Sequence, residues 1–286
     1  LTGGEITLRK DITSIISIIF NNSPQLYFFH FATNCLQPKL VKRVTEHALS
    51  FHPPKFAITL SLDGDEALHD SLRGVKGNWQ RVMETYSLLQ PLMKSGLEVV
   101  FGVTVSAANV NHLQQIIHAA KQRFPDLGWK DFHFNIAHHS SHYYGNATKV
   151  ASNNEVAQKT IAALRKFDAD RPSLWWLSPQ QWLDAQYRSY AAEYYRTRKS
   201  PLPCKSLQSS IFLDAYGNCY PCAMWAKKLF NIKDIDYSLT EYWHSPKADS
   251  IRADIAAKKC SNCWTPCEAY QTILGNIPRV LLHKTG

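Results

Sequence analysis

The amino-acid sequence predicts an α/β fold arranged as a partial, open barrel and followed by a small cysteine-rich domain. Short apolar stretches rich in β-branched and aromatic residues alternate with amphipathic stretches up to about residue 140. This alternation is typical of a parallel sheet covered by helices. Four strand-like stretches are too few for a complete eight-stranded barrel. Six of the seven cysteines lie between Cys204 and Cys267, which predicts the second domain.

The predicted strands are short and largely apolar, and they span residues 26–32, 55–62, 98–106 and 132–137. The amphipathic stretches between them lie near 11–21, 37–50, 77–95 and 110–124. In the stretch at 77–95, apolar side chains recur at helical spacing and Gly96 follows as a stop signal. A further strand is expected before Gly3, which favours a partial or open barrel over a complete eight-stranded one.

The pattern changes from about residue 150. Residues 153–168 and 179–197 are predicted to be helices, and Pro179 suits the first turn of the second one. Aromatic residues crowd into this region, and at helical spacing they indicate buried packing more than a substrate platform. They include Trp175, Trp176, Trp182, Tyr187, Tyr190, Tyr194 and Tyr195. A hairpin turn is expected at 215–218. We therefore divide the chain into a barrel (1–150), an aromatic-rich helical bridge (151–200) and a cysteine-rich domain (201–286).

Composition excludes some classes of protein. Hydrophobic residues make up 45% and charged residues 19%, which excludes a disordered chain. No apolar run is long enough for a membrane span, and nothing near the start resembles a signal peptide, so a cytoplasmic protein is expected. The formal net charge is +9, but the basic residues are scattered. We interpret them as solvated faces, which argues against a nucleic-acid partner.

The cysteine spacing indicates a metal site. It is Cys204-x14-Cys219-x2-Cys222, then Cys260-x2-Cys263-x3-Cys267. In the absence of a secretory signal, metal ligation is a better interpretation than disulfides. Two pairs, Cys219/Cys222 and Cys260/Cys263, fit a zinc ribbon but leave two cysteines unexplained. An iron–sulfur cluster would use Cys204, Cys222 and two of the last three. Spacing alone leaves zinc and cluster open.

Several segments resemble, in order, motifs of the radical S-adenosylmethionine (radical SAM) enzymes. They are Gly3-Gly4-Glu5-Ile6-Thr7-Leu8-Arg9-Lys10-Asp11, Thr33-Asn34, Ser61-Leu62-Asp63-Gly64, His69, and Leu72-Arg73-Gly74-Val75 with Gly77. Each lies at a predicted strand end or in the following loop, where α/β folds bind ligands. The cysteine-rich region resembles the SPASM/Twitch auxiliary-cluster domain of the same family. The resemblance covers nearly the whole chain and is weakest between about 140 and 200.

The resemblance implies a partial (β/α)6-type, TIM-like barrel that lacks its first unit. It also implies two cofactor sites. S-adenosylmethionine would be held at its amine by Gly3, Gly4 and Glu5, and elsewhere by Thr33, Asn34, Ser61 and Asp63. A glycine pair lets backbone amides approach a ligand, and a carboxylate accepts hydrogen bonds from an ammonium group. One auxiliary [4Fe–4S] cluster would be held by Cys204, Cys222, Cys260 and either Cys263 or Cys267, with Cys219 left over. Arg73 could pair with a carboxylate, but we interpret it as a solvated loop residue.

The sequence departs from the family pattern at three places. Ile6 replaces a proline, and Cys35 replaces a glycine and is interpreted as a small buried hydrophobe. The Cys-x3-Cys-x2-Cys (CxxxCxxC) triad that holds the catalytic cluster is absent, and in the family it lies upstream of the Gly-Gly-Glu loop. We therefore expect a truncated start and a chain that is inactive alone. Only Cys263 and Cys267 follow Cys260, which predicts a shortened, one-cluster module.

The resemblance implies a radical SAM oxidoreductase that modifies a peptide or small-molecule substrate with a 5′-deoxyadenosyl radical. It also implies an electron donor such as flavodoxin or ferredoxin. The alternative is a basic zinc-ribbon module that binds nucleic acid or protein without catalysis. His138, His139 and His142 follow a strand and could bind metal or substrate, but we interpret them as a polar loop. His30 and His133 are interpreted as core histidines.

Overall fold

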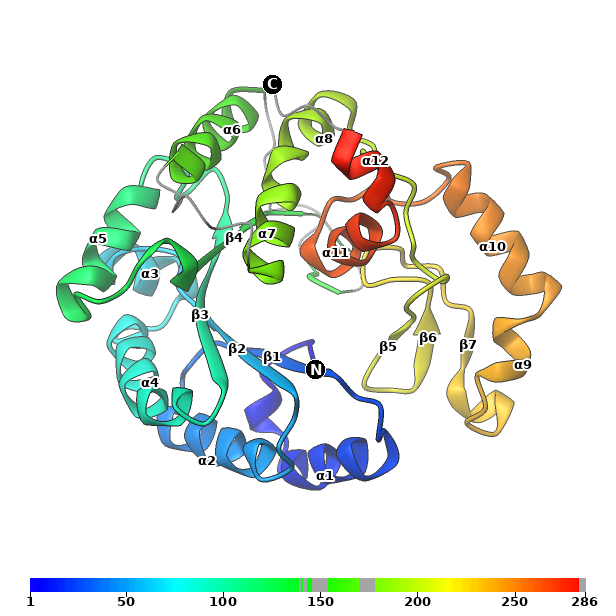
Figure 1. Ribbon diagram of the computed structural model, residues 1–286, viewed down its shortest axis with the longest axis horizontal. Helices are drawn as coiled ribbons and strands as arrows, with labels where there is room; N and C mark the ends of the chain where they lie inside the picture. The colour runs from blue at the N-terminus through cyan, green and yellow to red at the C-terminus, as the bar shows by residue number, and fades with distance from the viewer. Residues whose placement is uncertain (139, 141–142, 146–153, 170–177, 283–286) are drawn as a thin grey trace. The chain divides into compact units, whose positions relative to one another are not determined.

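The computed structural model describes residues 1–138, 140, 143–145, 154–169 and 178–282. The chain divides into two compact units, Leu1–Phe134 and Asn135–Gly286. The ribbon in Figure 1 labels the elements of both. The three-part division expected from the sequence, with boundaries near 150 and 200, stays a prediction.

The first unit is built on a parallel sheet. Its strands follow the order β1 (Phe28–Thr33), β2 (Lys55–Ser61), β3 (Leu97–Val105) and β4 (Phe132–Ile136). β1 pairs in parallel with β2, and β2 pairs in parallel with β3. Parallel neighbours that are consecutive in sequence need a crossover between them, and the helices supply it. The predicted α/β class and all four predicted strands are confirmed.

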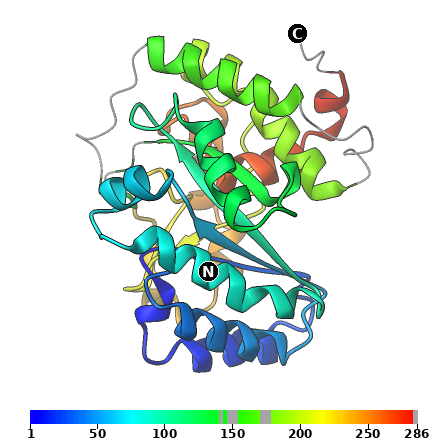
Figure 2. The same ribbon diagram turned by 90° about the vertical axis from the view of Figure 1, so that its left-hand side faces the viewer.

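Helices cover one face of this sheet, as Figures 1 and 2 show for α1, α2 and α4. The helices are α1 (Ile12–Asn22), α2 (Pro38–Leu49), α3 (Glu66–Arg73), α4 (Asn78–Met93) and α5 (Leu113–Arg123), with short 3-10 turns at Ile6–Leu8 and Trp129–Asp131. The ring of Phe29 packs 5.1 Å from Phe20, and that of Phe101 packs 5.0 Å from Tyr86. The core therefore lies between the sheet and these helices.

Helix α3 was not predicted from the sequence. His69 is its only buried side chain, so no buried apolar stripe marks the helix in the sequence. Asp65 caps its start by accepting a hydrogen bond from the Leu68 N–H at 3.1 Å. Gly74 ends it with φ 67°, in the left-handed region that favours glycine. The capping residues, and not hydrophobic burial, define this helix.

The second unit combines helices with a small antiparallel sheet. Its helices are α6 (Asn154–Ala169), α7 (Pro179–Ser189), α8 (Ala191–Thr197), α9 (Thr240–Trp243), α10 (Pro246–Ala256), α11 (Pro266–Leu274) and α12 (Ile277–Leu282). The sheet contains β5 (Phe212–Leu213), β6 (Asn218–Tyr220) and β7 (Phe230–Asn231), and a 3-10 turn follows at Ile232–Ile235. The hairpin predicted at 215–218 is confirmed, and Gly217 adopts φ 85° in its turn.

The single helix predicted over 179–197 is wrong, because the structure has two. Tyr190 separates α7 from α8 with ψ −4°, and its ring packs against Trp264 at 5.6 Å. Tyr187, Tyr190 and Tyr194 are buried, so the interpretation of these tyrosines as packing residues is confirmed. Trp175 and Trp176 lie outside the described residues. Among the described residues, none of the helices has the length and apolar character that crossing a membrane requires.

Candidate functional site

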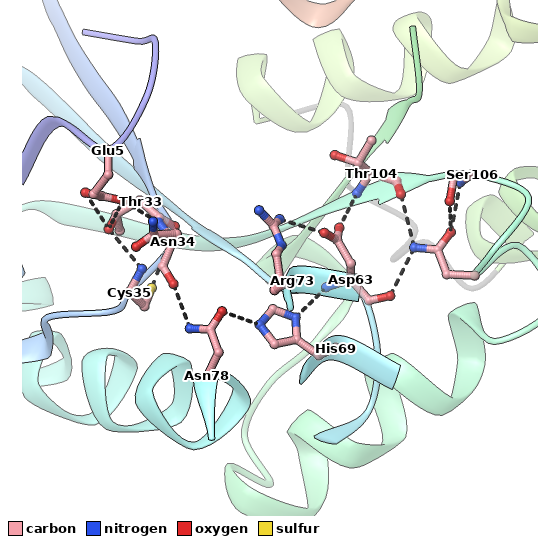
Figure 3. A network of polar contacts seen from close by, with 11 residues as sticks. Glu5, Thr33, Asn34, Cys35, Asp63, His69, Arg73, Asn78, Thr104 and Ser106 are labelled. Atoms are coloured by element: carbon pink, nitrogen blue, oxygen red, sulfur yellow. Dashed lines mark hydrogen bonds and ion pairs between the residues drawn. The ribbon is translucent and has the colours of Figure 1, made fainter. Parts of the chain in front are cut away.

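Glu5 lies at the carboxyl end of β1, where it accepts several hydrogen bonds (Figure 3). Its Oε1 accepts from the Thr7 hydroxyl at 2.7 Å, and its Oε2 accepts from the Asn34 N–H at 2.7 Å. The Thr33 hydroxyl lies 3.0 Å from both oxygens and can donate to one at a time. The carboxylate is therefore held in one orientation at the strand end. Gly3 and Gly4 precede it, and a Cβ at either would meet no atom within 4 Å.

A chain of polar contacts runs from this carboxylate toward β2 (Figure 3). Asn78 donates to the Asn34 carbonyl at 2.9 Å, and its Oδ1 lies 3.2 Å from Nε2 of His69. His69 Nδ1 accepts from the Asp63 N–H at 3.0 Å. Since Nδ1 is an acceptor, the proton of a neutral His69 is on Nε2. Burial lowers the pKa of His69, which favours this neutral form.

Asp63 joins the ends of β2 and β3. Its Oδ1 accepts from the Thr104 N–H at 2.9 Å, its Oδ2 lies 2.6 Å from Nη2 of Arg73, and its carbonyl accepts from Asn109 at 3.0 Å. The interpretation of Arg73 as a solvated loop residue is therefore wrong. Arg73 is the last residue of α3, a helix that the sequence did not reveal, and that helix places its guanidinium on Asp63.

The residues predicted to contact S-adenosylmethionine thus lie along one edge of the sheet. Glu5, Thr33, Asn34 and Asp63 belong to one connected polar network, and Ser61 ends β2 opposite Gly102 of β3. The roles of these residues stay predictions. Sequence reasoning missed the supporting members, which are Asn78, Thr104 and Asn109. Asn78 begins α4, Thr104 is the last residue but one of β3, and Asn109 lies in the turn after β3. These positions near element ends were the available signal.

Cys35 occupies a left-handed backbone position, with φ 61°. A glycine adopts this conformation without cost, whereas an L-residue is strained there by roughly 1–2 kcal/mol. The side chain is fully buried, and burial raises the pKa of its thiol to about 12. The interpretation of Cys35 as a small buried hydrophobe is confirmed.

Substitution of Cys35 tests this backbone conformation. We expect Cys35→Val to lower the free energy of unfolding by roughly 2–3 kcal/mol, because a β-branched residue is strained at positive φ and overfills the site. Cys35→Gly should change it by less than about 1 kcal/mol, since relief of strain offsets lost packing. Urea unfolding measures both. A valine variant as stable as the parent would contradict the left-handed assignment.

His30 projects from β1 and lies 2.9 Å through Nε2 from the Thr59 hydroxyl. Burial lowers the pKa of His30 to about 4, and neighbouring positive charges act in the same direction. The unfolded chain has an ordinary histidine pKa near 6.5, so it binds a proton before the folded protein does. The stability that neutral His30 contributes is therefore present above pH 6.5 and is lost as the pH falls toward 4.

The shift of the His30 pKa corresponds to a contribution of roughly 3 kcal/mol to the free energy of unfolding. We expect the free energy of unfolding to fall less steeply between pH 7 and 4 in His30→Gln than in the parent. His118→Gln is the matched control because His118 is exposed. Identical pH profiles for parent and His30→Gln would show that His30 is not held neutral.

Three cysteines of the second unit accept hydrogen bonds from backbone amides that follow them closely. The Ser206 N–H lies 3.4 Å from Sγ of Cys204. The N–H groups of Met224 and Trp225 point to Cys222, and that of Thr265 points to Cys263. In each case a donor comes from two residues further along the chain. Amide dipoles aimed at sulfur stabilise a thiolate, which is the form that binds metal.

These cysteines also lie close to one another. Burial, with smaller contributions from Glu268 and a neighbouring thiol, raises the pKa of Cys204 to about 11 and that of Cys222 to about 12. The pKa of Cys263 is raised well above its ordinary value by burial and then by Cys222. Cys260 is among the groups that act on Cys204. Electrostatic effects therefore link Cys204, Cys222, Cys260 and Cys263, and we call these four the grouped thiols.

The other two cysteines of this region differ. Burial and Asp214 raise the pKa of Cys219 to about 11. Cys267 is exposed, and among the described residues no other thiol acts on it electrostatically. Within the same described ranges, no three His, Cys, Asp or Glu side chains form a group that could hold a metal ion. The four grouped thiols have the donor chemistry of an iron–sulfur cluster, whose binding would release their protons.

Side chains next to the cysteines fix the loop that carries Cys222. Ser206 Oγ donates to the Pro221 carbonyl at 2.6 Å, and Ser261 Oγ donates to the Met224 carbonyl at 2.8 Å. Ser206 lies two residues after Cys204, and Ser261 directly follows Cys260. The bonds therefore tie the segments of Cys204 and Cys260 to that of Cys222. We expect the site to be ordered before a metal binds.

Of the three histidines predicted to form a polar loop, the structure describes only His138. His138 is buried, with 6% of its surface exposed, and it bonds to the Trp264 carbonyl. His138 thus lies in the loop that follows β4, as predicted, but its side chain is buried. Its contact with Trp264 was missed because the two residues lie 126 positions apart in sequence. His139 and His142 lie outside the described residues.

Comparison with known proteins finds a matching domain model and similar curated sequences. The SPASM model, an iron–sulfur cluster-binding domain, matches residues 204–264. The chain is 22% identical over 265 residues to the antilisterial bacteriocin subtilosin biosynthesis protein AlbA of Bacillus subtilis (strain 168), covering 92% of this chain and 52% of AlbA. The chain thus spans about half the length of this curated relative.

Solved structures show the same fold. The structure of native anSMEcpe with bound AdoMet matches with a TM-score of 0.58 and 16% identity, covering 98% of this chain and 82% of that one. Native anSMEcpe with bound AdoMet and Cp18Cys peptide matches with a TM-score of 0.56 and 16% identity, covering 98% and 83%. At this level of identity the likeness concerns the fold.

Proposed function

We infer that this chain, which belongs to the radical S-adenosylmethionine family and carries a SPASM iron–sulfur domain, acts in the modification of a peptide substrate. The chain resembles a bacteriocin biosynthesis protein, and a protein of similar fold has been captured with AdoMet and a peptide. Both similarities support a peptide over another small molecule. This activity is proposed for the whole protein. An electron donor such as a flavodoxin or ferredoxin is proposed as its partner.

The observation that carries the proposal for unit 1 is the oriented carboxylate of Glu5. Thr33 and Asn34 hold it at the strand end, where a methionyl ammonium group would replace the shared Thr33 hydroxyl bond. Gly3 and Gly4 leave space for backbone amides to meet the ligand. When bound, S-adenosylmethionine supplies the 5′-deoxyadenosyl group that the family uses to remove a hydrogen atom from its substrate.

The Asp63 network supports this site from behind. Both oxygens of Asp63 are engaged, so it fixes the relative positions of β2, β3 and Arg73. We propose that Asp63 shapes the cofactor site mainly through this rigidity, and that Ser61 contacts the cofactor from the end of β2. The chain's contribution to catalysis is therefore to bind, orient and shield.

The second unit is proposed to hold one auxiliary [4Fe–4S] cluster. Cys204, Cys222, Cys260 and Cys263 are the proposed ligands, because they form the group of neighbouring thiols and three of them accept amide hydrogen bonds. Cys267 is the second choice for the fourth ligand, and Cys219 is proposed to be structural. A cluster bound there would supply electron transfer or a binding site for substrate.

Titration calorimetry with S-adenosylmethionine tests the proposal for unit 1 directly. We expect the protein to bind about one molecule per chain, and S-adenosylhomocysteine to compete because it carries the same amino-acid group. Absence of heat with both ligands, for protein that is folded by circular dichroism, would contradict the proposal.

A further inference from the structure

His138 was singled out by the sequence as a candidate ligand, but the structure engages both of its ring nitrogens with protein groups. Nε2 lies 2.8 Å from the Trp264 carbonyl oxygen, and Nδ1 lies 3.2 Å from the hydroxyl of Tyr194. A carbonyl oxygen only accepts, so Nε2 carries the proton. Nδ1 is then the acceptor of the Tyr194 hydroxyl. Both side chains are buried, with 6% and 9% of their surfaces exposed.

The carbonyl that His138 binds belongs to the peptide unit that serves Cys263. That unit joins Trp264 to Thr265, and its N–H is the donor to the Cys263 sulfur. One planar peptide therefore accepts a hydrogen bond from His138 at its oxygen and donates one to sulfur at its nitrogen. Hydrogen bonds in such a series polarise one another, so donation by His138 strengthens the bond to sulfur.

The peptide is held firmly in place. The indole N–H of Trp264 donates to the Tyr187 carbonyl at 2.8 Å, and the side chain is 1% exposed. Two residues after His138, Ser140 Oγ donates to the Ala223 carbonyl at 3.3 Å, next to Cys222. The segment after β4 therefore supports both cysteine loops. It has the features of an outer layer of hydrogen bonds around a metal site.

We propose that Tyr194 and His138 are positioning residues that set the reduction potential of the auxiliary cluster through the Trp264–Thr265 peptide. This inference rests on the cluster proposed above. Hydrogen bonds to the sulfurs stabilise the more negative, reduced cluster and so raise its potential. The path runs from the Tyr194 hydroxyl through His138 and the peptide to Cys263 Sγ.

The test is a redox titration of the loaded protein, followed by electron paramagnetic resonance. We expect His138→Phe to shift the midpoint potential of the auxiliary cluster to more negative values, and Tyr194→Phe to shift it in the same direction by less. His138→Gln, whose amide N–H can donate to the same carbonyl, should recover part of the loss. Tyr195→Phe is the matched control, because the Tyr195 hydroxyl bonds to Thr160 and not to His138.

Iron and sulfide content separates the possible failures. Parent protein without iron and sulfide would overturn the proposed cluster, and this inference with it. Loaded Tyr194→Phe and His138→Phe proteins with the potential of the parent would overturn this inference alone. Since Tyr194→Phe removes one hydroxyl and keeps the ring, it tests the path even where His138→Phe does not fold. An equal shift in Tyr195→Phe would also contradict a path through His138.

Discussion

Alanine in place of Cys222 is expected to abolish iron–sulfur incorporation, whereas Cys219→Ala is expected to retain it. Cys222 lies among the grouped thiols and accepts two amide hydrogen bonds. Cys219 is buried on β6 against Asp214 and serves as a small hydrophobe. Loss of one ligand removes part of a binding free energy that for structural metal sites is on the order of 10 kcal/mol, so loading should fail. Iron and acid-labile sulfide per chain measure the outcome.

The same comparison decides the fourth ligand. We expect Cys263→Ala to resemble Cys222→Ala, and Cys267→Ala to resemble the Cys219→Ala control, because Cys263 and not Cys267 is grouped with other thiols. Thermal unfolding of each variant separates loss of metal from loss of fold. Equal loss of iron in the Cys219 and Cys222 variants, with both still folded, would contradict the ligand assignment.

Glu5→Gln is expected to weaken S-adenosylmethionine binding by roughly ten- to one-hundred-fold, since the charge-assisted bond from the methionyl ammonium is lost. The amide keeps one carbonyl oxygen for the Asn34 N–H, so the strand end should stay in place. Calorimetric titration measures the change. Glu98→Gln is the control, because Glu98 forms an exposed ion pair with Lys55 in the same sheet.

If Glu5→Gln binds S-adenosylmethionine as tightly as the parent does, the assignment of the Gly-Gly-Glu loop is contradicted. This holds whether or not the Glu98→Gln control binds more weakly. Thr33→Val provides an independent reading of the same contact. It removes the hydroxyl that bonds to Glu5 while keeping a β-branched shape for the strand. We expect a smaller loss than in Glu5→Gln, because Asn34 still orients the carboxylate.

The α/β fold class and the polar residues at the strand ends could be predicted from the sequence for a physical reason. Parallel strands buried on both faces are near-continuous apolar runs, so 55–62 and 98–106 stood out from the amphipathic stretches around them. Polar residues directly after such runs must meet at one sheet edge. Thr33 and Asp63 were therefore placed correctly on neighbouring strand ends, as the hydrogen-bonded network shows.

Other features depended on contacts that local sequence does not encode. Helix α3 has almost no buried face, and without it the pairing of Arg73 with Asp63 could not be foreseen. His138 meets Trp264 across 126 residues, and Tyr190 breaks a helix where it packs on that tryptophan. In each case tertiary contacts, and not local propensity, determine the position of the side chain.

The central claim, an auxiliary cluster held by the grouped cysteines, is tested most directly by metal analysis of anaerobically purified protein. The measurement is iron, zinc and acid-labile sulfide per chain. We predict about four irons and four sulfides for the auxiliary site, as four-cysteine cluster ligation implies. One zinc per chain without sulfide would contradict the account and would identify the region as a structural zinc ribbon.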